Sequence, residues 1–173
     1  MATLAKNPAK PKDDLARLHE ILASFDDAIL MTKRTDGTDH LHGRPMRIQA
    51  VEEDHSVWFF TSVDSSTVHE TMLDTEAYVI GQGDRKHAVV RGLATMTKDR
   101  ARIDKYWNKE VEAWFPEGKN DPNLCLVKFT PREGEWWDNS GVRGVQYVLS
   151  ATKAVLTGTT PKPSRDDHGK TVV

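Results

Sequence analysis

The stretch from residue 44 to 67 constrains the fold more than any other part of this chain, because it carries three element signals in succession. Residues 44–51 alternate polar and apolar side chains, which is typical of a strand with one buried face. After a polar turn, the aromatic run 57–61 has the length and composition of a second strand. Hydroxyl and acidic residues then precede a helical spacing of apolar residues, which predicts a helix over 64–73.

The junction between the aromatic strand and this helix has the character of an anion site. The first N–H groups of a helix lack partners within it, and its N-terminal end is the positive end of its dipole. Arg44 and the aromatic strand lie close by in the sequence. Together they suit a ligand with a phosphate at one end and a flat ring at the other.

The rest of the chain predicts a single mainly β domain. Residues 1–12 are expected to form a flexible N-terminal tail, 13–158 the domain, and 159–173 a polar C-terminal tail. The expected elements are helix 13–25, strands 28–33, 77–82, 87–96, 124–130 and 135–138, a helical region over 97–114, and a last helix over 145–155. Strands 28–33, 44–51 and 57–61 are expected to form a meander. Successive strands with short turns favour antiparallel pairing, so the fold class is a six- or seven-stranded antiparallel β-barrel with flanking helices.

Composition excludes several classes of protein. The 173 residues carry a net charge of −2, which argues against nucleic-acid binding. No apolar run of about 18 residues predicts a membrane span, and no signal peptide is evident, so a cytoplasmic location is expected. The single Cys125 excludes an internal disulfide and is expected to be a buried strand thiol rather than a reactive one. His40 and His42 lack further ligands at metal-binding spacing, so no metal site is predicted.

Several segments, in order, resemble one family. They are Arg-Pro-Met at 44–46, Trp-Phe-Phe-Thr at 58–61, the acidic and hydroxyl-rich helix start, and the downstream stretches 89–94, 114–118, 121–122 and 136–138. Their order and spacing resemble the general-stress-protein branch of the pyridoxamine-phosphate-oxidase-like, FMN-binding split-barrel family. The resemblance covers residues 13 to 158.

This resemblance implies a split barrel that forms a homodimer, with FMN (or FAD) in the interface between the subunits. It implies that the cofactor contacts Arg44, Pro45, Met46, Gln49, Phe60, Thr61, Ser62, Ser65, Ser66, Thr67, His87, Trp137 and Asp138. The phosphate would lie at Arg44 and the helix start, and the ring near Met46, Phe60 and Thr61. His87 or Trp137 would come from the second subunit. Relatives usually carry a lysine in place of Thr67, so FMN is bound weakly here or another cation, Arg44, Arg47 or Lys86, meets the phosphate.

Alternatives remain open for some of these residues. Arg44 alone also fits a solvated strand arginine, and His87 a surface histidine. Trp107 and Trp114 lie on a helical face and are expected to be core residues.

Three functions are compatible with the sequence: a flavin-dependent oxidoreductase or stress protein, a non-enzymatic module that binds flavin, haem or deazaflavin, and a dimeric barrel without cofactor. Catalytic residues are not predicted. Vitamin B6 oxidation is not expected, because no basic cluster near the C-terminus suits that substrate's phosphate.

Overall fold

The computed structural model describes residues 11–38, 40–140 and 168–173. Its elements are α1 (Pro11–Ala23), β1 (Asp27–Lys33), β2 (Leu41–Arg47), β3 (Ala50–Val51), β4 (Val57–Ser62), α2 (Ser66–Leu73), β5 (Glu76–Gly83), β6 (Lys86–Thr97), α3 (Arg100–Tyr106), α4 (Lys109–Trp114), the 3-10 turn η1 (Gly118–Asn120), β7 (Leu124–Asp138) and β8 (His168–Val172). None of the helices in these described ranges is long and apolar enough to cross a membrane.

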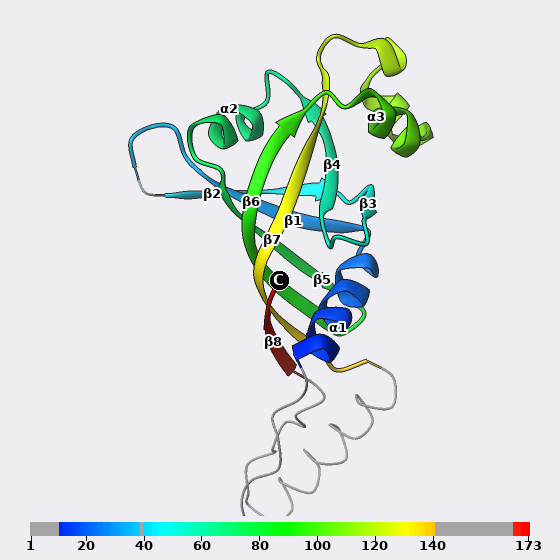
Figure 1. Ribbon diagram of the computed structural model, residues 1–173. Coiled ribbons are helices and arrows are strands. Elements are labelled where there is room, and N and C mark those ends of the chain that lie inside the picture. Colours follow the sequence, from blue (N-terminus) through cyan, green and yellow to red (C-terminus); the bar gives the residue numbers. More distant parts are fainter. Residues whose placement is uncertain (1–10, 39, 141–167) are drawn as a thin grey trace, which may run out of the picture.

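One antiparallel sheet contains all the described strands (Figure 1). Seven of them follow the order β2-β1-β5-β6-β7-β4-β3, and β8 pairs with β7. The two strands at the ends of this order, β2 and β3, are separated in the chain only by residues 48–49. The sheet therefore curls until its ends approach each other, which makes it a split barrel. The prediction of a mainly β, antiparallel split barrel with flanking helices is confirmed.

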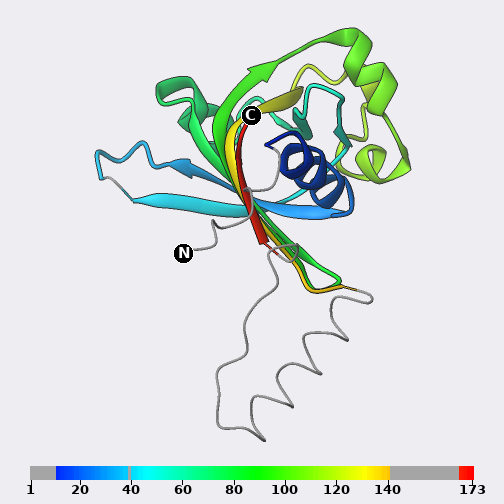
Figure 2. The same cartoon turned by 60° about the horizontal axis from the view of Figure 1, so that its bottom comes forward.

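Helix α1 lies inside the curl of the sheet (Figure 2). Leu18 of α1 and Phe25, just beyond the end of the helix, reach strand glycines: a Cβ on Gly81 would lie 2.2 Å from the Phe25 ring, and one on Gly134 would lie 2.4 Å from Leu18 Cδ2. These glycines let the helix approach the sheet closely. The helix and the inward residues of β1, β4, β5, β6 and β7 form the main core.

The single strand predicted over 44–51 is wrong, because the chain leaves one end of the sheet there and joins the other. Ile48 N donates to Asp26 O, whereas Gln49 N donates to Trp58 O, at 2.9 Å each. As a result β2 pairs with β1 and β3 pairs with β4, and the predicted three-strand meander does not form. Polar and apolar residues keep alternating over residues 47–50, where the chain crosses from one end of the sheet to the other, so the hydrophobic pattern does not indicate the crossing.

Other boundaries also differ from the prediction. Strands 124–130 and 135–138 are one continuous strand, β7. The helical region 97–114 divides into α3 and α4, since Asn108 caps α4 by accepting from Glu110 N and Val111 N. Within the predicted polar tail, His168–Val172 form β8, and α1 begins at Pro11 within the predicted N-terminal tail. The predicted helix 145–155 lies outside the described residues.

Candidate functional site

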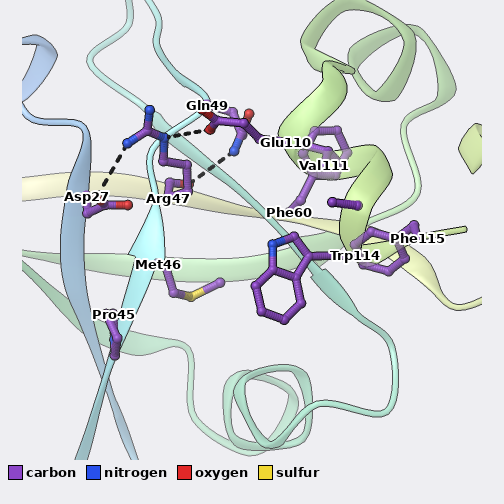
Figure 3. A pocket seen from close by; sticks show the side chains of 11 residues that line it. Asp27, Pro45, Met46, Arg47, Gln49, Phe60, Glu110, Val111, Trp114 and Phe115 are labelled. Carbon is purple, nitrogen blue, oxygen red and sulfur yellow. Dashed lines mark hydrogen bonds and ion pairs between the residues drawn. The ribbon is translucent and has the colours of Figure 1, made fainter.

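A cavity of about 620 Å³ opens at the split of the barrel, between β2, β4 and α4 (Figure 3). It is lined by Asp27, Pro45, Met46, Arg47, Gln49, Phe60, Glu110, Val111, Ala113, Trp114 and Phe115. Sulfur, aromatic and aliphatic groups predominate among these side chains. An apolar hollow of this size with a few polar groups is the usual form of a small-molecule site.

Helix α4 supplies the aromatic wall of the cavity. Trp114 projects from the end of α4 toward Met46 (Figure 3) and is 83% exposed. The expectation that Trp114 is a core residue is therefore wrong. Trp107 is partly buried, as expected, and meets Phe60 edge-on with ring centroids 6.2 Å apart. The cavity thus has three aromatic residues: Phe60 and Phe115, which are partly buried, and Trp114, whose ring is largely exposed.

Charged side chains stand at the mouth of the cavity. Arg47 Nε lies 3.1 Å from Glu110, and its Nη1 lies 3.4 Å from Asp27. Gln49 Oε1 accepts from Asn108 Nδ2 at 2.9 Å, which ties the link between β2 and β3 to the start of α4. Arg47 Nη2 also lies 3.9 Å from Asp26, so one guanidinium faces three carboxylates here.

Arg44 takes part in a polar cluster with the buried residues Thr32, Thr67 and Glu70 and with His42 at its half-exposed edge. Its Nη1 donates to Thr32 Oγ1 and Thr67 Oγ1, both at 2.9 Å. Its Nη2 donates to Glu70 Oε2 at 2.5 Å and lies 2.6 Å from His42 Nδ1. Thr32 Oγ1 in turn donates to Glu70. Arg44 is therefore not a solvated strand arginine, because three elements, β1, β2 and α2, hold it in place.

Glu70 is the anion of this cluster. Burial alone raises the pKa of Glu70, but hydrogen bonds from Thr32 and Arg44 outweigh that effect, and the pKa lies below its ordinary value. Glu70 is thus ionised at neutral pH even though its side chain is only 5% exposed.

The start of α2 follows the capping pattern that the sequence indicates. Ser65 is the N-cap, and its Oγ accepts from Val68 N at 3.3 Å. Thr61 Oγ1 donates to the same Ser65 Oγ at 3.1 Å, so the end of β4 is tied to the helix start. Ser66 is exposed and Thr67 is buried. Ser62 Oγ accepts from the Asp64 N–H at 3.4 Å.

His87 and Trp137 lie in a second hollow of about 410 Å³, on the face of β5, β6 and β7 that points away from α1. Trp137 stacks on His168 of β8, with ring centroids 5.1 Å apart. Asp138 lies elsewhere: it is fully buried and pairs with Arg17 of α1, outside both hollows.

The predicted site residues therefore fall into separate groups within one chain. The cavity is lined by Pro45, Met46, Gln49 and Phe60, whereas Arg44 and Thr67 belong to the polar cluster around Glu70. The start of α2 is surrounded by Thr61, Ser62, Ser65 and Ser66. The second hollow contains His87 and Trp137. Sequence reasoning missed Glu70, Glu110 and Phe115. Their contacts depend on how α2 and α4 dock on distant strands, for which the sequence gives no local signal.

Comparison with known proteins decides the family. The sequence matches the pyridoxamine 5'-phosphate oxidase-like family over residues 13–162. The chain belongs to this family. Within it, the chain belongs to the general-stress-protein branch, as the sequence predicts. A segment of 53 residues is 36% identical to General stress protein 26 of Bacillus subtilis (strain 168), and this segment spans 36% of the length of that relative.

Solved structures of the family share the fold. A general stress protein 26 from Jannaschia sp. CCS1 superposes with a TM-score of 0.73 at 24% identity, covering 95% of this chain and 100% of that one. The general stress FMN/FAD binding protein from Xanthomonas citri is 31% identical, with a TM-score of 0.59, covering 75% of this chain and 92% of that one.

Proposed function

We propose that this chain binds a flavin in the cavity at the split of the barrel and serves as a flavin-dependent oxidoreductase of the general stress type. The observation that carries the proposal is the aromatic and apolar lining of that cavity by Met46, Phe60 and Trp114. Its volume suits a tricyclic ring. The Xanthomonas citri relative, an FMN/FAD binding protein, supports the choice of flavin over other flat ligands.

The residues present fit the ring of a flavin better than its phosphate. Met46 and Phe60 offer apolar contact, and the exposed face of Trp114 suits stacking on an aromatic ring. Arg44, by contrast, is already paired with Glu70. A bound flavin supplies hydride or electron transfer at its ring. The side chains of the cavity orient that ring and keep water from one of its faces.

An apolar row on the outer face of the sheet, opposite α1, supports a homodimer. Pro45, Ile29, Ile80 and Val89 are successive register partners across β2, β1, β5 and β6. Ile29 and Val89 remain 37% and 38% exposed. A second copy packed on this row would cover it and would bring its own His87 and Trp137 toward the cavity. Each dimer would then hold two equivalent flavin sites.

Titration of flavin fluorescence tests the proposal. The purified protein, added to FMN or to riboflavin, is expected to quench the fluorescence of at least one of them by stacking its ring. Anaerobic addition of NADH or NADPH is then expected to bleach the visible absorbance of the bound flavin. Absence of quenching with both flavins would contradict flavin binding, and quenching without bleaching by either reductant would contradict this oxidoreductase activity.

A further inference from the structure

The terminal nitrogens of Arg44 already have hydrogen-bond partners inside the protein. A guanidinium has five N–H groups, four of them on its two terminal nitrogens. Nη1 donates to Thr32 and Thr67, and Nη2 donates to Glu70 and faces His42 Nδ1 at 2.6 Å. The Arg44 side chain is only 16% exposed. An incoming phosphate would have to displace these partners to reach Arg44.

Arg44 directly precedes the cavity residues Pro45 and Met46 on β2, so it marks one end of the site, and Glu70 supplies a negative charge that balances it there. The carboxylate is 5% exposed, and Thr32 as well as Arg44 donates to it. His42 Nδ1 also lies 3.0 Å from Glu70 Oε1. Removing Arg44 from Glu70 would nevertheless deprive a buried carboxylate of its guanidinium partner, which is costly inside a protein. Residues 62–75, which surround and include α2, contain no lysine or arginine but carry the further acidic residues Asp64 and Asp74.

Among the described residues, the mouth of the cavity offers no excess of positive charge either. Arg47 contributes a guanidinium group to the lining, and this group lies 3.1 Å from Glu110 and 3.4 Å from Asp27. A phosphate monoester carries about two negative charges at neutral pH. It would therefore meet a balanced ion pair at one end of the site and a net negative mouth at the other.

We infer that Glu70, by occupying Arg44, makes this site select a flavin whose tail carries no phosphate, so that riboflavin is preferred to FMN. This inference rests on the proposed flavin site and names its ligand more closely. Ribityl hydroxyls need partners that both donate and accept, and Thr61 and Ser65, which follow Phe60 along the chain, provide hydroxyls of that kind.

Calorimetric titration of the full-length protein with riboflavin and with FMN tests the inference directly. The wild type is expected to bind riboflavin at least about threefold more tightly than FMN. In Glu70→Gln, which keeps the shape of the side chain but removes its charge, Arg44 becomes available to an anion. FMN affinity is then expected to rise by about tenfold, while riboflavin affinity stays within about twofold.

Glu76→Gln is the matched control. It removes the same charge from an ion pair with Arg91, at 2.7 Å, that lies outside the cavity and the Arg44 cluster. It is expected to leave the preference for riboflavin over FMN unchanged. Tighter binding of FMN than of riboflavin by the wild type would overturn the inference while leaving the flavin site intact. Binding of neither ligand would overturn the proposed function itself.

Discussion

At Gly92 the sheet leaves no room for a side chain. A Cβ at this position would lie 2.3 Å from Thr130 O and 2.7 Å from Phe129 Cζ, where the register of β6 and β7 shifts. Gly92→Ala is therefore expected to lower the free energy of unfolding by about 1–3 kcal/mol, measured by chemical denaturation. The exposed neighbour Thr95→Ala serves as control and should change it by less than about 0.5 kcal/mol. If the two variants were equally stable, β6 and β7 would have made room for the added methyl group without loss of stability.

Cys125 is buried on β7, as the sequence predicts. Burial raises the pKa of its thiol to about 11, so almost none of it is ionised at pH 8. A thiol reagent such as DTNB is expected to leave the native protein unmodified at that pH and to label one thiol per chain after denaturation. Rapid labelling of the folded protein would instead mark Cys125 as reactive.

A substitution at Trp114 can test ligand binding without changing stability, because its side chain is 83% exposed and yet lines the cavity. Trp114→Ala is expected to weaken flavin binding by about 5- to 30-fold through loss of stacking, with the thermal midpoint almost unchanged. Leu73→Ala removes another exposed apolar side chain, on α2 and outside the cavity, and should not affect flavin affinity. Equal affinity of wild type and Trp114→Ala would remove Trp114 from the site.

At the level of elements, Glu52 fastens α3 to the barrel. It accepts from Tyr106 OH, from Lys105 Nζ at 3.2 Å and from Trp58 Nε1 at 3.0 Å, and it lies 3.4 Å from Arg102 Nη2. The hydrogen bond from Tyr106 is the largest cause that lowers the pKa of Glu52 from 4.5 to about 2, against the opposing effect of burial. A carboxyl group whose pKa is lowered by folding stabilises the protein fully above pH 4.5. That contribution is lost as the pH falls from about 4.5 to 2.

Glu52→Gln is therefore expected to cost about 1–3 kcal/mol of unfolding free energy at pH 7. The difference from the wild type should shrink as the pH approaches 2, because the wild-type carboxyl group is then protonated as well. Urea denaturation at pH 7 and pH 3 measures both values. A difference that does not depend on pH would mean that packing, and not the charge of Glu52, holds α3.

Some helices and strands of this fold can be predicted from the sequence, whereas the way in which they pair cannot. Helix α2 and its Ser65 cap are visible in advance, because capping and periodicity are local. The crossing at Ile48 and Gln49 is not, since the backbone partner of Ile48 is Asp26, just before β1, whereas that of Gln49 is Trp58 on β4. The same holds for the site: the aromatic strand indicates a ring-binding surface, but the pairing of Arg44 with Glu70 exists only after α2 has docked beside β1 and β2.

At the scale of the whole molecule, we propose that the apolar row on the outer face joins two copies. Ile29→Lys would place a charge inside that row, between Pro45 and Ile80, neither of which can neutralise it. The variant is expected to run as a monomer in light scattering and to lose flavin affinity together with the dimer. Met72→Lys, an equally large change at an exposed position of α2, should do neither. A wild-type protein that is itself monomeric would exclude the dimer.

Mixed dimers test whether each flavin site is shared between subunits. If Phe60 of one subunit and Trp137 of the other serve the same flavin, homodimers of Phe60→Ala or of Trp137→Ala have no complete site. In a mixed dimer of the two variants, however, one site receives both native side chains, because each subunit supplies what its partner lacks. Calorimetry on mixed dimers purified through two different tags is therefore expected to recover wild-type affinity at half the wild-type stoichiometry. If both residues acted within one chain, mixing would restore no site, since every chain would still carry one defect.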